Sequence, residues 1–227
     1  MSKLIYTGKT KNVFENTDGT YTLKLKDDAT GKDGVFDPGE NSVGLSIEGL
    51  GRESLKITKY YFEKFTKEGI PNHYISSNTD QVTMTVKPGK IFGQGLEFVC
   101  RVKANGSFLK RYGDYCQFSD KLNYFVEVTL KNDEKQDPPI TKDAIVLLGI
   151  MSEKEYETCK ELTIKAAKLI ERDLTQKGME LHDIKFEFGT NNGDIMLIDE
   201  ISAGCMRVYK DNTPVQPMEL ASLVSSD

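Results

Sequence analysis

The residues best suited to chemistry in this sequence are acidic and basic side chains near its C-terminal end. Asp183, Lys185 and Glu187 alternate with apolar residues over 183–188, so they share one face of a predicted strand. Asp199 follows a second, shorter apolar run. Carboxylates beside a lysine are hard oxygen ligands, which bind Mg²⁺ together with substrate phosphates and water. Glu187 and Asp199 are therefore candidate metal ligands.

Whether these two acids share a face depends on the hairpin that joins them. Residues 189–194 have the Gly and Asn chemistry of a turn, and 195–198 form a short apolar return strand. Because side chains alternate with period two, an odd-length loop would put Glu187 and Asp199 on one face. A second interpretation stays open, in which the charges only decorate a solvated hairpin edge.

Two lysines near the N-terminus are spaced to hold phosphate groups. Lys9 and Lys11 lie in a tight turn, and in an extended segment a spacing of two makes them project the same way. Their ammonium groups could bind a polyphosphate, although a solvated basic hairpin tip has the same local pattern. Neither a P-loop nor a full G-x-G-x-x-G motif occurs in the sequence.

A hydroxyl between arginines marks a second candidate phosphate site. Ser107 follows Asn-Gly in a predicted turn, with Arg101 before it and Arg111 after it. Free backbone N–H groups, a hydroxyl and guanidinium groups suit a phosphate monoester. An ordinary surface turn would have the same local sequence, so both interpretations stay open.

The composition limits the classes of function. The 227 residues suit one compact domain or two small ones that share a cleft. With 30 basic and 35 acidic residues, the sequence has no basic stripe for nucleic acid and no polybasic patch for a membrane. Four widely spaced cysteines without C-x-x-C predict reduced thiols. Because there is neither a secretory signal nor a long apolar run, we expect a cytoplasmic protein.

The elements that must position these residues begin with a β-rich N-terminal part. Apolar periodicity predicts three strands and then a helix, at 4–6, 12–15, 21–26 and 54–67. The intervening stretch, 27–51, is rich in glycine and acid and is predicted to be a loop. Asp33 in this loop could bind ligand hydroxyls, although an acidic solvent loop is an equal alternative.

The second part of the chain alternates between strands and helices. Strands are predicted at 73–75, 82–86, 97–103 and 124–130, and helices at 141–148 and 152–177. The Lys87-Pro88-Gly89 break predicts a hinge, which gives an N-terminal lobe of residues 1–87 and a C-terminal lobe of 88–227. The predicted class is α+β, with antiparallel sheets and packed helices.

Longer motifs carry a family resemblance over nearly the whole chain. They are Y-T-G-K-T-K-N-V-F at 6–14, K-D-D-A-T-G-K-D-G at 26–34, E-G-I-P at 68–71, L-E-F-V-C-R at 96–101, N-G-S-F-L-K-R at 105–111, D-I-K-F-E-F-G at 183–189 and L-I-D-E-I-S at 197–202. In this order they resemble the phosphoribosylaminoimidazole-succinocarboxamide synthase (SAICAR synthetase) family of purine biosynthesis.

The resemblance implies a fold and a reaction. The fold would have two α+β lobes with ATP in the cleft between them. The reaction would join L-aspartate to carboxyaminoimidazole ribonucleotide, giving SAICAR, ADP and phosphate. ATP would first phosphorylate the carboxylate, and the aspartate amine would then displace phosphate, which requires charge control more than a side-chain nucleophile. The implied partners are these small molecules. Neither nucleic acid nor a membrane is expected from the composition, and a homodimer is one open alternative for the oligomeric state.

The matching motifs also imply roles for single residues. For ATP they are Lys9, Lys11, Val86 and Lys87, and for Mg²⁺ they are Glu187 and Asp199, with Lys185 neutralising developing charge. For the substrates they are Asp33, Arg101, Ser107, Arg111 and Arg207. In this set the ribonucleotide phosphate would be held by Arg101, Ser107 and Arg111, and a substrate carboxylate by Arg207.

The sequence departs from the family pattern in three places. Ala203-Gly204 stand where the family usually has Pro-Asp, and Gly95-Leu96-Glu97 and Arg101-Val102 replace Pro-Leu-Glu and Arg-Asn. Family members also commonly continue into another helix beyond the position of Ser226-Asp227. Gly204 and the short C-terminus motivate one alternative, a catalytically silent, nucleotide-binding regulatory protein. The other alternative, independent of these departures, is an ATP-dependent phosphotransferase with a different acceptor.

Overall fold

The computed structural model describes residues 2–225, so Ser226 and Asp227 lie outside the described residues. The chain divides into two compact units. Among the described residues, the first unit contains 2–90, 189–204 and 216–225, and the second contains 91–188 and 205–215. The predicted lobes of 1–87 and 88–227 have a boundary close to residue 90. They differ from the units because two later segments of the chain pack with the first unit.

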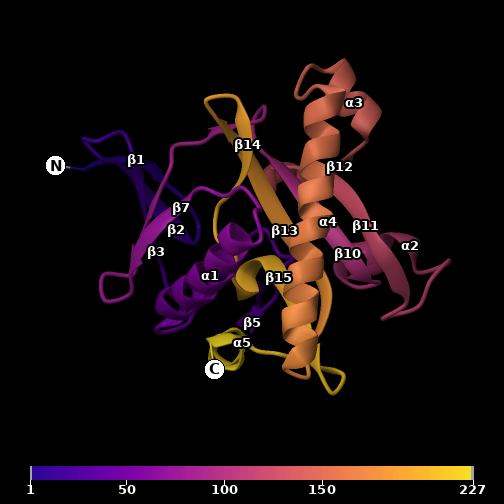
Figure 1. The fold of residues 1–227 in the computed structure, drawn as a ribbon. Helices are drawn as coiled ribbons and strands as arrows, with labels where there is room; N and C mark the ends of the chain where they lie inside the picture. The colour runs from indigo at the N-terminus through magenta and orange to yellow at the C-terminus, as the bar shows by residue number, and fades with distance from the viewer. Residues whose placement is uncertain (1, 226–227) are drawn as a thin grey trace. The chain divides into compact units, whose positions relative to one another are not determined.

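The first unit is built on a five-stranded antiparallel sheet with the order β1-β2-β3-β8-β7. Its strands are β1 (Lys3–Thr7), β2 (Lys11–Glu15), β3 (Tyr21–Leu25), β7 (Tyr74–Asn78) and β8 (Thr83–Val86). Helix α1 (Leu50–Lys67) packs against this sheet (Figure 1). Leu23 and Met84 oppose each other in the register and are both buried, because alternation turns the apolar residues of neighbouring strands to one face. The strands predicted at 4–6, 12–15 and 21–26 are confirmed.

The prediction of a loop over 27–51 is wrong. This stretch forms a three-stranded sheet with the order β5-β4-β6, built from β4 (Asp28–Lys32), β5 (Val35–Phe36) and β6 (Val43–Ser46). The glycines carry no side chains, so these strands lack the alternating pattern by which strands are predicted. The same glycines let the strands pair, because their backbones can approach closely. A Cβ at Gly44 would lie 2.2 Å from the carbonyl oxygen of Gly31, a contact that no other residue could make.

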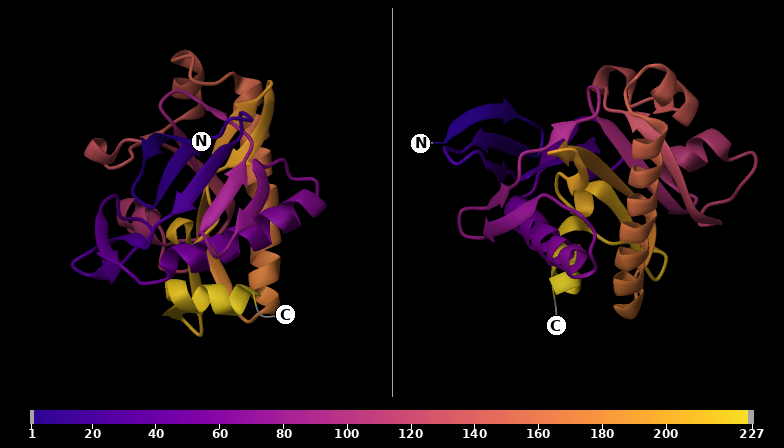
Figure 2. Two further views of the ribbon diagram at one scale, coloured as in Figure 1. Left: turned by 90° about the vertical axis from the view of Figure 1, so that its left-hand side faces the viewer. Right: turned by 45° about the horizontal axis from the view of Figure 1, so that its top comes forward.

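Helix α1 begins at Leu50, earlier than the predicted start at residue 54. The carboxylate of Asp27 accepts hydrogen bonds from the backbone N–H groups of Gly49 and Gly51, at 3.0 and 2.9 Å. An acid at this end satisfies N–H groups that have no partner inside the helix. Helix α5 (Pro217–Ser225), which was not assigned from the sequence, packs beside α1, as the left view of Figure 2 shows.

The second unit is built on an antiparallel sheet with the order β12-β11-β10-β13-β15-β16. Its strands are β10 (Leu96–Lys103), β11 (Lys121–Leu130), β12 (Pro139–Ile140), β13 (Glu180–Asn191), β15 (Met206–Lys210) and β16 (Thr213–Pro214). Two further strands, β9 (Lys90–Ile91) and β14 (Asp194–Ile198), also pair with β13, and β14 belongs to the first unit. Its helices are α2 (Gly106–Tyr112), α3 (Lys142–Leu147) and α4 (Glu153–Gln176).

The two faces of this sheet differ in chemistry. Phe98 and Phe186 are on one face, where α4 packs along the sheet and its Tyr156 ring lies 5.7 Å from that of Phe98 (Figure 1). The other face carries buried charged residues, namely Glu97, Arg101, Glu127, Asp183 and Glu187. We call this the polar face. Helix α4 begins with the predicted capping box of Ser152 and Glu155, which is confirmed.

The predicted class, α+β with antiparallel sheets and packed helices, is confirmed. Among residues 2–225, no helix is both long enough and apolar enough to cross a membrane.

Candidate functional site

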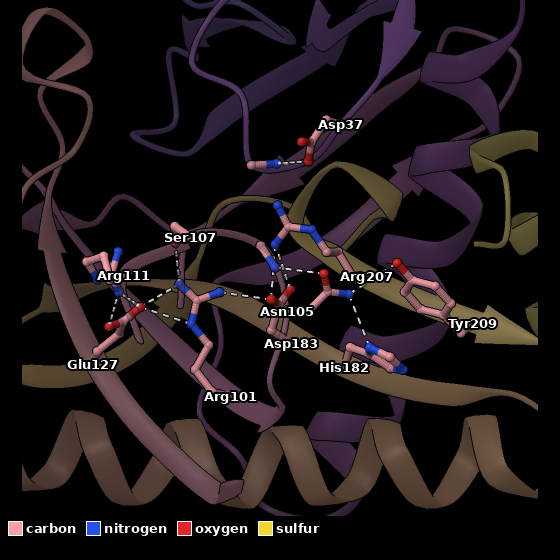
Figure 3. A network of polar contacts seen from close by, with 12 residues as sticks. Asp37, Arg101, Asn105, Ser107, Arg111, Glu127, His182, Asp183, Arg207 and Tyr209 are labelled. Atoms are coloured by element: carbon pink, nitrogen blue, oxygen red, sulfur yellow. Dashed lines mark hydrogen bonds and ion pairs between the residues drawn. The ribbon is translucent and has the colours of Figure 1, made fainter. Parts of the chain in front are cut away.

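Arg101 is the centre of the polar face. Its Nε and Nη2 donate to Oε1 of Glu127, at 2.9 and 2.5 Å, and its Nη1 donates to Oδ2 of Asp183 at 2.8 Å (Figure 3). Three neighbouring strands hold the three residues, with Arg101 on β10 directly opposite Asp183 on β13 and with Glu127 on β11. All three are buried. A guanidinium between two carboxylates satisfies the charges that burial would otherwise make costly.

The other predicted substrate-binding groups of this unit join the same network. Oγ of Ser107 accepts from Nη2 of Arg101 at 2.8 Å. Arg111 Nη2 donates to both carboxylate oxygens of Glu127, at 2.8 and 2.5 Å, and Arg207 Nη1 donates to both oxygens of Asp183, at 3.1 and 3.0 Å (Figure 3). The structure therefore brings together Arg101, Ser107, Arg111 and Arg207.

The prediction of a turn around Ser107 is wrong, because the segment is the short helix α2. Asn105 precedes the helix, and its Oδ1 accepts from the backbone N–H of Gly106 at 2.7 Å. The Asn-Gly pair has turn chemistry, and it lies where the chain enters the helix. Ser107 and Arg111 are four residues apart on α2 and so lie on one side of it. The helix thus supplies a hydroxyl and a guanidinium to the network together.

Exposure separates the roles of the three arginines. The side chain of Arg101 is 4% exposed, whereas those of Arg111 and Arg207 are 29% and 14% exposed. A ligand from solvent would therefore meet Arg111 and Arg207 first, and Arg101 would support the groups around it.

No site role was assigned to Glu127 or Asp183 from the sequence. Glu127 is in a predicted strand among apolar residues, and Asp183 shares a predicted face with Lys185 and Glu187. The alternation of charged with apolar residues in these strands was the signal that could have identified both acids. A charged residue in a buried strand needs a partner of opposite charge. The partner could not be identified without the strand order.

Lys185 and Glu187 lie further along the polar face with two other charged residues. Lys185 Nζ lies 2.9 Å from Oε1 of Glu97 and 3.6 Å from Oε1 of Glu187, which is also 2.6 Å from Nζ of Lys131. Glu97 and Glu187 oppose each other in the register, and like charges at such positions are destabilising unless cations intervene. The interpretation as a solvated hairpin edge is wrong, because β13 is an interior strand between β10 and β15.

In the first unit, Lys11 forms ion pairs with Asp199 and Glu200. Oγ1 of Thr10 also donates to Oε1 of Glu200 at 3.1 Å. Burial and the neighbouring charge of Asp199 raise the pKa of Glu200. The predicted phosphate-binding turn is therefore joined by Lys11 to the acidic segment that follows β14.

The register argument for Asp199 does not hold. Strand β13 extends to Asn191, so the hairpin turn is only Asn192 and Gly193, an even-length loop. Asp199 lies beyond β14 with a φ of 73°, and a left-handed residue ends the period-two alternation. The condition for a shared face, an odd-length loop, is therefore not met, and strand alternation does not put Asp199 on one face with Glu187.

The remaining predicted residues are also in the first unit. Lys9 is in the turn between β1 and β2, and Asp33 is between β4 and β5 with a φ of 53°. Val86 ends β8 with a buried side chain, and Lys87 Nζ donates to the carbonyl oxygen of Asn72 at 3.3 Å. Among residues 2–225, no three or more His, Cys, Asp or Glu side chains are grouped as a metal site by themselves.

His73 contacts the backbone of Asp199. Its Nε2 donates a hydrogen bond to the carbonyl oxygen of Asp199 at 2.9 Å. The neutral ring is therefore the tautomer with the proton on Nε2 and none on Nδ1. Burial lowers the pKa of His73 to about 4. The folded protein therefore binds a proton at this ring less readily than the unfolded chain does.

We expect acid to destabilise the protein through this histidine. Between pH 7 and pH 5 the loss should be about 2 kcal/mol for one such ring, because the unfolded ring is protonated below about pH 6.5 and the folded ring only near pH 4. His73→Gln keeps an N–H donor near the Nε2 position and does not titrate, so its pH dependence should be smaller by that amount. Urea unfolding at the two pH values measures this. Equal losses in the variant and the parent would contradict the prediction.

Comparisons with known proteins agree with the motifs. The model of the SAICAR synthetase family matches residues 4–219. A phosphoribosylaminoimidazole-succinocarboxamide synthase of Clostridium tetani is 56% identical over 97% of this chain and 98% of its own length. One of Finegoldia magna is 35% identical over 94% of this chain and 88% of its own length.

Solved structures agree in fold. A SAICAR synthetase (Type-2) in complex with ADP is 27% identical and superposes with a TM-score of 0.85, covering 98% of this chain and 97% of that one. The enzyme of Ehrlichia chaffeensis is 26% identical with a TM-score of 0.83, covering 98% and 94%. The predicted resemblance is confirmed. On the family match and on these relatives, the chain belongs to the SAICAR synthetase family.

Proposed function

We propose that this protein is an ATP-dependent carbon–nitrogen ligase that joins L-aspartate to carboxyaminoimidazole ribonucleotide, giving SAICAR, ADP and phosphate. The observation that carries the proposal is the assembly of Arg101, Ser107, Arg111 and Arg207 into one network, in a chain that belongs to this family. Three guanidinium groups and a hydroxyl form an anion site suited to a phosphate monoester and a carboxylate.

Within this network we assign the exposed groups to direct contact. Ser107 and Arg111 hold the ribonucleotide phosphate, and Arg207 holds a substrate carboxylate. Arg101 is a positioning residue, because its guanidinium donates hydrogen bonds to Ser107, Glu127 and Asp183. The bonds to the two carboxylates fix the orientation of this guanidinium before a ligand binds. Asp33 binds a substrate hydroxyl.

We assign ATP to Lys9, Lys11, Val86 and Lys87. The lysines bind phosphate oxygens, and the residues at the end of β8 contact the nucleoside. Support comes from the SAICAR synthetase solved in complex with ADP, which is similar over 98% of this chain. In the free protein Lys11 pairs with Asp199 and Glu200, so a polyphosphate would compete with these acids for its ammonium group.

We assign Mg²⁺ to Glu187 and Asp199. The donor chemistry fits, because both are carboxylates that already hold a compact positive charge, Lys131 on Glu187 and Lys11 on Asp199. When bound, Mg²⁺ supplies neutralisation of charge on the phosphoryl group being transferred. Lys185 adds a further positive charge beside Glu187.

The cellular compartment and the binding partners of the protein are also proposals. The cysteines of the described residues, Cys100, Cys116, Cys159 and Cys205, are free thiols, which supports a reducing compartment such as the cytoplasm. We further propose that its partners are the small-molecule substrates and a second copy of the chain, with neither nucleic acid nor membrane among them.

The test is whether ADP release depends on both co-substrates. With ATP and Mg²⁺ present, we expect ADP and SAICAR to form in equal amounts only when both the ribonucleotide and aspartate are supplied. ADP release with the ribonucleotide alone, at a sustained rate, would favour a phosphotransferase. Nucleotide binding without turnover in any mixture would favour a silent regulatory protein.

A further inference from the structure

His182 is displaced from its regular place in β13. Leu181 pairs with Val208 and Asp183 pairs with Arg207, so β13 has one more residue than β15 between these pairs, and that residue is His182. In a regular strand His182 would share the apolar face with Ile184. The bulge turns its side chain to the polar face instead, and bulges beside functional sites commonly re-aim a side chain in this way.

The His182 ring is buried in an aromatic setting. It is 2% exposed, stacks on Tyr209 with ring centroids 4.1 Å apart and planes 18° apart, and lies 5.4 Å from the ring of Phe118. Burial lowers the pKa of His182 to about 4. The charged groups around it are Lys103, Asp183, Arg207 and Glu180, the last with an oxygen 3.8 Å from Nε2. The ring is therefore neutral at physiological pH.

The hydrogen bonds of Asn105 fix the role of this neutral ring. A backbone N–H can only donate, so the atom of Asn105 that faces Gly106 N at 2.7 Å is the carbonyl oxygen, and the amide nitrogen is at the other end. That nitrogen lies 3.1 Å from Nδ1 of His182 and 3.2 Å from the hydroxyl oxygen of Tyr209 (Figure 3). Nδ1 of His182 must then be the acceptor.

Asn105 thus connects the ring to the substrate network. Gly106, which it caps, has a φ of 53°, and a Cβ there would lie 2.6 Å from Cζ of Arg207, so the guanidinium lies against the Gly106 backbone. Ser107, the next residue, accepts from Arg101 at 2.8 Å. The angle at which the chain enters α2 therefore sets the positions of Arg207 and Ser107 together.

We propose that His182 and Asn105 are a pair of positioning residues for the ribonucleotide, in which the neutral ring orients the Asn105 amide and the amide fixes Ser107 and Arg207. Neither touches the substrate. The inference rests on the proposed function, because it takes Ser107 and Arg207 as substrate contacts. If it holds, breaking the His182–Asn105 bond weakens ribonucleotide binding and leaves ATP binding unchanged.

Two single variants test the bond from its two ends. His182→Phe keeps an aromatic ring against Tyr209 and removes the acceptor, and Asn105→Ser keeps a capping hydroxyl and cannot reach the ring. Loss of the His182–Asn105 bond should raise the KM for the ribonucleotide by roughly 3- to 12-fold in each variant, the value of one neutral hydrogen bond, with the KM for ATP unchanged. Asn105→Ser also loses the bond to the Tyr209 hydroxyl, so it should be the poorer of the two. The double variant should be no worse than the poorer single variant, because both remove the same bond.

A rescue variant and a control variant complete the set. His182→Asn restores an acceptor near the Nδ1 position, so its KM for the ribonucleotide should return towards the parent value. Phe118→Leu removes a ring contact of His182 and no hydrogen bond, so its KM should stay within about twofold of the parent. Thermal unfolding of all variants separates lost stability from lost positioning. Where His182→Phe does not fold, Asn105→Ser and His182→Asn decide the matter.

The outcomes are distinct. Equal rises in both KM values, additive effects in the double variant, or lower thermal stability with an unchanged KM would each overturn the proposal. Arg111→Ala and Arg207→Ala are measured in parallel. If these leave the KM for the ribonucleotide unchanged, the assigned substrate site has failed. If they raise it and the His182 and Asn105 variants do not, only the positioning pair has failed.

Discussion

Glu187→Gln and Asp199→Asn should each lower kcat by about 100- to 1,000-fold, the usual cost of losing one group that stabilises transition-state charge. Each amide keeps the shape of the side chain and an oxygen acceptor, and removes one negative charge from the proposed Mg²⁺ ligands. Because the metal acts on the phosphoryl group during transfer, the loss should fall on kcat more than on the KM values. Steady-state kinetics over a series of Mg²⁺ concentrations measures it.

The structure supplies a matched control for this prediction. Lys131 Nζ lies 2.6 Å from Glu187, and its side chain is 41% exposed. If Glu187 acts only through ion pairs, Lys131→Met should reproduce the defect of Glu187→Gln. If it binds metal, Lys131→Met should keep most of kcat, and only the acid variants should change the Mg²⁺ dependence. Near-normal kcat in both acid variants at saturating Mg²⁺ would remove the metal assignment.

Arg101→Ala should lower the free energy of unfolding by about 3 to 5 kcal/mol, because it leaves two buried carboxylates without their shared cation. Arg101 makes four hydrogen bonds in this network, to Glu127, Asp183 and Ser107. Arg111 and Arg207 still contact the two acids, but from more exposed positions. Urea unfolding measures the loss, and ribonucleotide binding should weaken as well because Ser107 loses its donor.

Arg111→Ala is the contrasting variant. Its guanidinium is partly exposed and shares Glu127 with Arg101, so its removal should cost about 1 kcal/mol or less of stability. The KM for the ribonucleotide should nevertheless rise roughly ten- to a hundredfold, as expected for a lost charge-assisted contact. If Arg101→Ala were as stable as the parent, the supporting role of Arg101 would be wrong.

The sequence predicted the elements with regular periodicity and missed those built on glycine. The alternation over 97–103 and 183–188 matches β10 and β13, because a sheet with one apolar and one polar face needs that pattern. The strands β4, β5 and β6 were missed, because Gly31 and Gly44 serve the close approach of backbones and carry no side-chain pattern.

In the network around Arg101, the arginines and Ser107 could be predicted from the sequence, whereas Glu127 and Asp183 could not. Arg101, Ser107, Arg111 and Arg207 belong to motifs, whereas the acids that hold them depend on which strands are neighbours. The pairing of β10 with both β11 and β13 joins segments far apart in the chain, and local patterns do not contain that information. The bulge at His182 could likewise not be predicted from the sequence, because it is a shift in the register between β13 and β15. The metal and nucleotide assignments stay predictions.

The division of the first unit among three chain segments has a consequence for its synthesis. Helix α5 packs on α1, yet it follows the whole of the second unit in chain order. At roughly 5–20 residues per second, a ribosome needs many seconds between completing α1 and completing α5. The second unit has most of its chain available before α5 exists, so it can fold first. Until α5 has been made, it cannot cover its surface on α1, and we expect a chaperone that binds this protein during translation to bind there.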